Sequence, residues 1–181
     1  MKLKTSIFLT TLATLGVISS ADAGSAVDMY AGMTIGAGAQ TAFADNQDRT
    51  NTAQSFGAMF GVDIPMFRVE AEYNYLTTAN SHSNVALANV YFKMPSTVIK
   101  PYLGLGIGLN FNGEDTEYAT IKYDTTTAYQ AMLGVTLGVP ALPFKFDVEA
   151  RALYLPDVYK IANVSPDILQ YEGRVKIRYI F

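Results

Sequence analysis

The chain has 181 residues, of which 50% are hydrophobic and only 16% are charged, and this length allows one domain with a sizeable core. It contains no Cys, which excludes disulfides, thiolate metal sites and a cysteine nucleophile. The net charge is only -3 and there is no basic run, so nothing in the composition favours a nucleic-acid partner.

The first 23 residues have the pattern of a secretory signal peptide. Lys2 and Lys4 precede the apolar segment SIFLTTLATLGVI, and Ala21-Asp22-Ala23 provides a small-x-small cleavage signal before Gly24. The alternative is an uncleaved anchor, but the apolar segment is shorter than the roughly 20 residues that a helix needs to cross a bilayer. We therefore expect residues 1–23 to be removed after export and residues 24–181 to form one mature domain.

After the signal, hydrophobicity repeats every second residue, and no helical period of 3.6 residues persists. In FKFDVEARALY (144–154), the apolar and the polar residues fall on opposite parities, as on the two faces of a strand. The same pattern predicts eight strands, each about long enough to cross a bilayer when tilted. They lie near residues 29–38, 54–64, 67–76, 85–94, 99–110, 127–139, 144–155 and 169–181.

The connections between these strands alternate between long and short. Long connections are expected at 39–53, 77–82, 111–126 and 156–168, and short turns at 65–66, 95–98 and 140–143. This layout predicts an all-β fold, an eight-stranded antiparallel up-and-down transmembrane β-barrel with both termini on the short-turn side.

The charges decide which face of the strands is inside. In the three strands that carry several charges, every charge lies on one parity, while the other parity is free of charge. A secreted lipocalin-like barrel, with the apolar face inside, is the alternative, but its water-facing surface would not stay free of charge over eight strands. We therefore predict a charge network in the lumen: Arg68, Glu70, Glu72, Lys145, Asp147, Glu149, Arg151, Glu172, Arg174, Lys176 and Arg178.

The apolar parity is rich in Tyr and Phe near the strand ends, as expected for aromatic girdles at two membrane interfaces. These residues are Tyr73, Tyr75, Tyr129, Phe144, Phe146, Tyr154, Tyr179 and Phe181.

The charges in the lumen can pair with one another, and we expect Arg174 to pair with a carboxylate such as Glu149 or Glu172.

The segment LANVYFKMPSTVIKPYLGLGIGLNF (87–111) resembles the central hairpin of the small outer-membrane barrel and surface-antigen family, which is related to the OmpA transmembrane domain and to opacity proteins. The matching residues are Asn89, Tyr91, Phe92, Pro95, Lys100, Pro101, Tyr102, Gly104, Gly106 and Gly108. The resemblance implies a multi-pass barrel in the bacterial cell outer membrane.

The C-terminal RVKIRYIF is similar to the signal by which the outer-membrane assembly machinery recognises its substrates, with Tyr179 and Phe181 as the implied signal residues. Nothing follows Phe181, so the periplasmic peptidoglycan-binding domain of the full OmpA type is expected to be absent.

The Gly-x-Gly-x-Gly segment does not match a dinucleotide-binding loop, which would need Gly at position 109, where the chain has Leu. Gly104, Gly106 and Gly108 share the inward parity, and we expect them to leave space for long side chains in the lumen.

Acyl chemistry on lipid A is the enzymatic alternative, since enzymes occur on small outer-membrane barrels. The only His, His82, would have to be the base, but the neighbouring Ser81 and Ser83 point away from it on an extended segment. One His is also too few ligands for a metal site. We therefore expect no catalytic, cofactor or metal site.

The favoured function is a structural scaffold that displays acidic surface loops, with adhesion or host contact as the implied role and a small porin as the alternative. The expected partners are outer-membrane lipids and lipopolysaccharide, the assembly machinery, and a host or surface ligand of the loops. The loop charges are the acids Asp45, Asp48, Glu114, Asp115, Glu117, Asp124, Asp157 and Asp167 and the bases Arg49, Lys122 and Lys160.

Overall fold

The structure is a computed structural model, which describes residues 27–44, 47–95, 99–115, 121–122, 125–138, 142–158 and 167–181. The expected signal peptide and its cleavage site lie outside these residues. So do four of the expected loop charges, Asp45, Glu117, Asp124 and Lys160.

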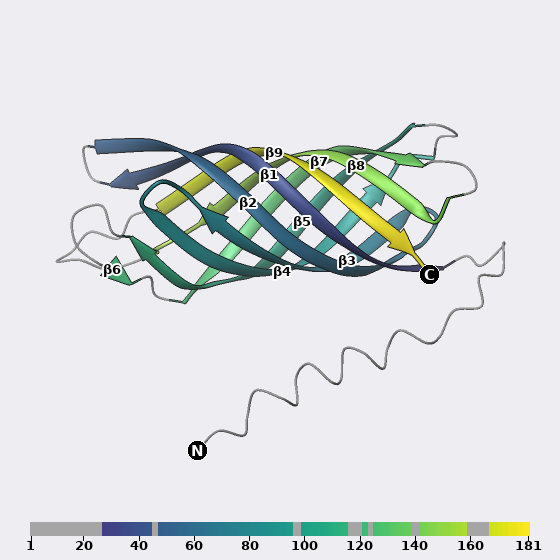
Figure 1. The fold of residues 1–181 in the computed structure, drawn as a ribbon, viewed down its shortest axis with the longest axis horizontal. Coiled ribbons are helices and arrows are strands. Elements are labelled where there is room, and N and C mark those ends of the chain that lie inside the picture. The colour runs from purple at the N-terminus through teal and green to yellow at the C-terminus, as the bar shows by residue number, and fades with distance from the viewer. Residues whose placement is uncertain are drawn as a thin grey trace, which may run out of the picture.

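The described chain is almost entirely β-strand, and its strands form a closed barrel (Figure 1). Around the ring the order is β4-β3-β2-β1-β9-β8-β7-β5, and β5 pairs back with β4. The strands are β1 (Asp28–Ala44), β2 (Gln47–Asp63), β3 (Phe67–Thr77), β4 (Ser81–Lys93), β5 (Ile99–Asp115), β6 (Ile121–Lys122), β7 (Thr126–Gly138), β8 (Phe144–Leu155) and β9 (Asp167–Ile180). The predicted eight-stranded antiparallel barrel is confirmed; β6 is a two-residue addition that pairs with the end of β5.

Closure of the ring brings the first and last long strands together. β1 and β9 pair antiparallel from Tyr30↔Ile180 to Phe43↔Asp167, and the Phe181 amide donates to the Met29 carbonyl oxygen at 2.9 Å. The C-terminus and the start of β1 therefore lie at the same end of the barrel as the short turns (Figure 1). A closed ring leaves none of its eight long strands with a free edge.

The strands extend further toward the long-loop end than the sequence pattern predicts. The expected loop 39–53 is mostly a hairpin, in which β1 and β2 pair as far as Ala44↔Gln47. Likewise β4 begins at Ser81, β5 continues to Asp115 and β9 begins at Asp167, so His82, Glu114 and Asp167 are strand residues and not loop residues. Backbone pairing continues here where the alternation of polar and apolar residues has faded, which is why the pattern ended too early.

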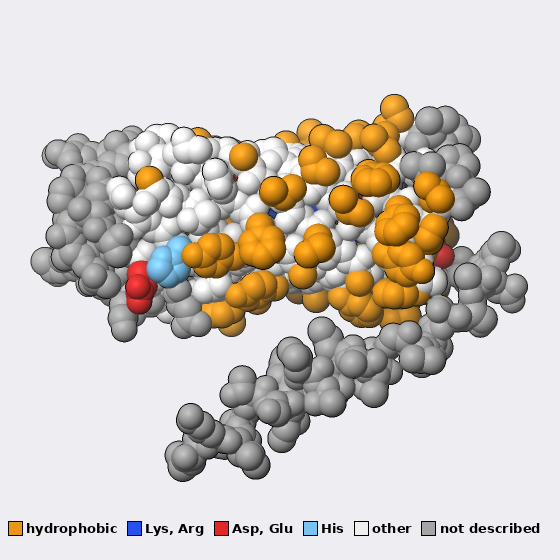
Figure 2. Space-filling model, viewed as in Figure 1, with side chains coloured by type: hydrophobic (Ala, Val, Ile, Leu, Met, Phe, Trp, Pro, Cys, Tyr) orange, Lys and Arg blue, Asp and Glu red, His pale blue; other side chains and the backbone are white. Residues whose placement is uncertain are grey.

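The outer surface of the barrel is apolar. On the face shown in Figure 2, hydrophobic side chains cover the middle and the short-turn end, while the described residues toward the long-loop end are mostly of other types. Leu105 and Ile35, on β5 and β1, are 71% and 66% exposed. Among the described residues there is no helix that is both long and apolar enough to cross a membrane.

Aromatic residues lie near both ends of this outer surface. Toward the short turns, Phe67 packs edge-on against Phe92 with ring centroids 5.6 Å apart, and Phe144 packs against Tyr179 at 5.3 Å. Toward the long-loop end, Tyr129 is paired with Tyr154 across β7 and β8, and both are exposed. The structure thus places two rows of aromatic side chains on the outside, as a barrel in a bilayer requires.

Candidate functional site

The lumen is filled by the charged side chains that the sequence analysis assigned to it. Ten of them are buried: Arg68, Glu70, Glu72, Asp147, Glu149, Arg151, Glu172, Arg174, Lys176 and Arg178. The eleventh, Lys145, lies nearer the short-turn end and its side chain is 25% exposed. We call these eleven residues the lumen charge network.

Arg174 on β9 lies at the centre of this network. Its guanidinium is paired with Glu72 of β3 and Glu149 of β8, with Arg174 Nε 2.9 Å from Glu149 Oε1. Arg174 Nε also lies 3.7 Å from Glu172, which pairs with Arg151 at 2.5 Å. Arg174 therefore lies close to carboxylates from three strands. Two of these carboxylates, Glu149 and Glu172, are the partners that the sequence suggested for it.

Lys176, the next inward residue of β9, continues the network toward the short turns. Its ammonium nitrogen lies 3.1 Å from Glu70, 3.5 Å from Glu149 and 2.9 Å from the Tyr91 hydroxyl. Glu70 also accepts hydrogen bonds from Tyr30 at 2.7 Å and from Tyr91 at 2.8 Å. Such full pairing is what makes buried charges tolerable in a barrel interior.

A second centre forms around Asp147 on β8. Arg178 Nε donates to Asp147 at 2.7 Å, Arg68 Nη1 at 3.1 Å, and the Thr136 hydroxyl at 2.6 Å. The Arg68 guanidinium also lies over the Tyr91 ring, 3.9 Å from its centroid. This stacking stabilises a cation whose one ion pair among the described residues is with Asp147.

Polar neighbours complete the network, and the sequence analysis did not assign them to it. Asn89 donates to Glu72 at 2.6 Å and accepts from Gln130 at 2.7 Å, while Tyr102 donates to Glu149 at 2.9 Å. Each lies on the inward parity of its strand, so the same alternation could have found them. Neutral side chains carry no charge signal, so Asn89 and Tyr102 were named from the sequence only as residues of the family resemblance.

Glycines on the inward parity make room for these long side chains. A Cβ on Gly104 would lie 2.5 Å from the Tyr91 ring, and one on Gly106 would lie 2.1 Å from the Asn89 side-chain oxygen. Gly108 differs, since its Cβ would meet the Ala86 carbonyl oxygen at 1.9 Å, which is a close approach of neighbouring backbone. The steric use expected for Gly104 and Gly106 matches this packing.

The half of the lumen nearer the long-loop end is closed by apolar side chains. We call this cluster the outer apolar plug; it contains Leu76, Val85, Leu87, Ala128, Leu153, Leu155, Val158 and Ile168. Val158 belongs to the segment that follows β8 and is fully buried there. This layer was not predicted from the sequence, because the inward parity was expected to be polar along the whole strand.

The start of that segment is held in place by β9. The Asp157 amide donates to Asp167 at 3.1 Å, and Tyr154 donates to the other oxygen of Asp167 at 2.6 Å. Asp157 has a positive φ of 48°, which is uncommon for a residue other than glycine. These contacts fix the turn that brings Val158 into the plug.

His82, the residue that acyl chemistry would need, lies on β4 toward the long-loop end. Its ring is 6.0 Å from that of Tyr75, whereas the neighbouring Ser83 is buried on the other face of the strand. The structure therefore brings neither adjacent serine hydroxyl to His82. Within the described ranges no group of three or more His, Asp or Glu side chains is arranged to hold a metal ion.

The residues of the implied assembly signal lie outside the barrel at the short-turn end. Tyr179 and Phe181 are exposed, and their ring centroids are 5.4 Å apart. Tyr179 contacts Phe144 as well, so three aromatic rings form one outward cluster beside the C-terminus.

Replacing Phe181 by Ser is expected to reduce the amount of folded protein in the outer membrane severalfold while leaving chemically refolded protein nearly unchanged. The physical reason is that the substitution keeps the backbone hydrogen bond to Met29 and removes only a ring on the outer surface, packed against Tyr179. Quantitative blotting of membrane fractions and circular dichroism after refolding measure the two effects. Phe144→Ser, which removes another ring of the same cluster, is the control and should insert normally; normal insertion of Phe181→Ser would remove the recognition role.

Comparison with known proteins gave matches at the level of structure alone. No protein-family model matches the sequence, and a search of curated proteins found no relative. The crystal structure of neisserial surface protein A aligns with a TM-score of 0.60 and 15% identity, over 82% of this chain and 96% of that one. The N-terminal β-barrel domain of OprF from Pseudomonas aeruginosa aligns with a TM-score of 0.53 and 10% identity, over 83% of this chain and 97% of that one. This chain therefore shares the fold of the small eight-stranded β-barrels of the bacterial outer membrane.

Proposed function

We propose that the chain is an integral protein of the bacterial outer membrane, exported with a signal peptide that is then removed, and that it acts as a closed scaffold for the surface-exposed ends of its strands. One observation carries the proposal: the apolar residues face outward and the charged residues face inward. A barrel surrounded by water would have the opposite arrangement, because apolar surface is stabilised by leaving water.

Lipid is the natural partner of this outer surface. Val69, Leu103 and Ile107 are each more than half exposed on neighbouring parts of the ring, and the rows of aromatic residues lie toward both ends of it. We propose that the acyl chains contact the apolar surface, and that phospholipid and lipopolysaccharide head groups lie at the two aromatic rows. Assembly into the membrane would proceed through recognition of the C-terminal strand.

The filled lumen favours a scaffold over a porin. An eight-stranded barrel is just wide enough for its side chains to fill it. Here the lumen charge network fills the middle, and the outer apolar plug lies between that network and the long-loop end. Paired charges in the middle and apolar side chains beyond them favour a closed lumen over the water-filled polar path that ion conduction needs.

The long-loop end supports a role in surface contact. The β1–β2 hairpin and the end of β5 continue into the part of the barrel where hydrophobic side chains are sparse (Figures 1 and 2). Glu114 lies on β5 in this region, and Asp157 and Asp167 lie beside each other after β8. Rigid scaffolds commonly present binding segments in this way, and one similar structure is named as a surface protein. We propose attachment to a host or other surface as the function of this end, without a catalytic step.

Cysteine labelling tests the proposed location and orientation. The chain has no Cys, so a single Thr125→Cys at the long-loop end and a single Met66→Cys at the short-turn end give two clean reporters. On intact cells a membrane-impermeant maleimide should label Thr125→Cys alone, while both should react after lysis. Labelling of Met66→Cys on intact cells, or of neither variant, would contradict the proposal.

A charge-neutralised variant tests attachment separately. Glu114→Gln, Asp115→Asn and Asp157→Asn together remove acidic charge from the long-loop end without changing any residue of the lumen charge network. Attachment of bacteria to a layer of host cells should fall toward that of bacteria lacking the protein, with equal surface amounts shown by labelling at Thr125→Cys. Unchanged attachment would remove these acids from the contact.

A further inference from the structure

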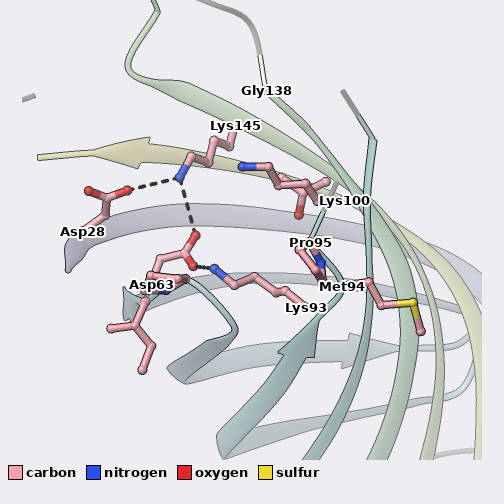
Figure 3. Close-up of a pocket in the computed structure, with 11 residues that line it drawn as sticks. Asp28, Asp63, Lys93, Met94, Pro95, Lys100, Gly138 and Lys145 are labelled. Atoms are coloured by element: carbon pink, nitrogen blue, oxygen red, sulfur yellow. Dashed lines mark hydrogen bonds and ion pairs between the residues drawn. The ribbon is translucent and has the colours of Figure 1, made fainter. Parts of the chain in front are cut away.

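A pocket opens at the short-turn end of the barrel, where Lys145 of the lumen charge network forms part of its wall (Figure 3). Its volume is about 340 Å³, within the range of sites that hold small molecules. Six strands and two short turns contribute to its wall. The lining residues are Asp28, Asp63, Ile64, Pro65, Lys93, Met94, Pro95, Lys100, Thr136, Gly138 and Lys145.

Three lysines and two aspartates give this pocket an excess of positive charge. Lys93 pairs with Asp63, and Lys145 lies 3.3 Å from Asp28 and 3.5 Å from Asp63. Asp63 is shared further, since Arg178 donates to it from the lumen side at 3.2 Å. The Asp63 carboxylate thus pairs with three cations, and its single negative charge does not neutralise all of them.

Lys100 has no carboxylate partner among the residues that the structure describes. It is exposed at the start of β5, and its ammonium group points into the same space as those of Lys93 and Lys145 (Figure 3). An ammonium group has three donors, and Lys93 and Lys145 also retain donors after their pairs with aspartate. The pocket therefore gathers cationic donors without enough acceptors.

The other polar groups nearby are already engaged. The Thr136 hydroxyl donates to Asp147 and accepts from Arg178, and the Met94 amide donates to the Pro101 carbonyl oxygen. The acceptors that the ammonium groups lack must therefore come from a ligand or from water. Ile64, Pro65, Met94 and Pro95 offer that ligand an apolar side as well.

We propose that this pocket binds the phosphate group of a small phosphate ester or of a lipid head group. Lysine ammonium groups are compact point charges that suit phosphate oxygens, whereas the guanidinium groups that would favour bidentate carboxylate binding are paired in the lumen. The inference goes beyond the scaffold role and depends only on the pocket, whichever side of the membrane its mouth faces.

Calorimetric titration of the protein in neutral detergent at low ionic strength, with glycerol 3-phosphate as the probe, tests this. Saturable binding at one site is expected. Lys100→Gln should weaken it by about fivefold, because it removes the cation that no carboxylate compensates. Asp28→Asn lies in the same pocket and should strengthen binding, because it removes a competing carboxylate.

Lys122→Gln on β6, at the other end of the barrel, makes the same change in net charge and is the matched control. An equal effect of Lys122→Gln, no effect of Lys100→Gln, tighter binding of succinate than of glycerol 3-phosphate, or no saturable binding would each overturn the proposal. Nanodiscs identify the source of the phosphate. Weaker binding of glycerol 3-phosphate in phosphatidylglycerol than in phosphatidylcholine supports a lipid head group, and equal binding supports a free ester.

Discussion

Replacing Arg174 by Ala is expected to lower the free energy of unfolding by about 3 to 5 kcal/mol, the range for removing one partner of a buried ion pair. Arg174 is fully buried and pairs with Glu72 and Glu149. Without it Lys176 is the one described cation that still pairs with Glu149, at 3.5 Å, and with Glu72, at 3.9 Å. Lys176 also pairs with Glu70 at 3.1 Å, so one ammonium group is left to compensate three buried carboxylates.

Urea unfolding in lipid vesicles measures the loss, followed by circular dichroism because the chain has no Trp. Lys145→Ala is the matched control: its ion pairs lie near the mouth with the side chain 25% exposed, and such pairs contribute about 0 to 1 kcal/mol. Equal, small losses for both variants would mean that the network contributes little to stability.

The wild-type protein is expected to show no stable open channel in planar lipid bilayers. Two layers of different chemistry block the lumen, and each would have to open for ions to pass. The lumen charge network fills the middle of the barrel with paired side chains, and the outer apolar plug offers ions few polar groups to replace their hydration shell.

Removing one layer should leave the barrel closed, while Arg174→Ala combined with Leu76→Ala and Leu153→Ala should produce measurable current. Compact migration on an unboiled gel, lost after boiling, shows that each preparation is folded. Large steady currents from the wild type would contradict the closed scaffold and make the chain a small porin.

Alternation was sufficient to predict which way the strands face, because charge is excluded from lipid more strictly than from almost any other environment. The strand FKFDVEARALY illustrates this: Asp147, Glu149 and Arg151 are buried in the lumen, while Val148 is half exposed on the outside. The same segregation placed Arg174, Lys176 and Arg178 together on β9. Period-2 patterning is informative wherever the two faces meet different surroundings.

Where the two faces of a strand meet similar surroundings, the period-2 alternation is lost and the sequence does not predict a strand. In the β1–β2 hairpin, Gln40 faces Asn51 and Thr41 faces Thr50, with a hydrogen bond of 3.0 Å between the two threonine hydroxyls. Small polar residues on both parities resemble a loop in sequence, but backbone pairing continues through them. The predicted loop 39–53 was wrong for this reason.

The ion-pair geometry and the outer apolar plug also lay beyond the sequence. Register between strands decides that Glu72 of β3 meets Arg174 of β9, two residues 102 positions apart in the chain. Leu153 and Leu155 follow the inward parity of Arg151, yet leucine at that position is equally compatible with a lumen or a lipid contact. Only the closed ring shows that they pack with Leu76, Leu87 and Ile168.

The central claim is that the apolar face of the barrel contacts lipid and the charged face does not, and fluorescence quenching by brominated lipids tests it most directly. The chain has no Trp, so one Trp at a time reports a single position. On β5, Leu105 is 71% exposed on the outside and Tyr102 is buried in the lumen. In vesicles with brominated acyl chains we expect strong quenching of Leu105→Trp and little quenching of Tyr102→Trp. Equal quenching, or stronger quenching at position 102, would contradict the inside-out arrangement on which the whole account depends.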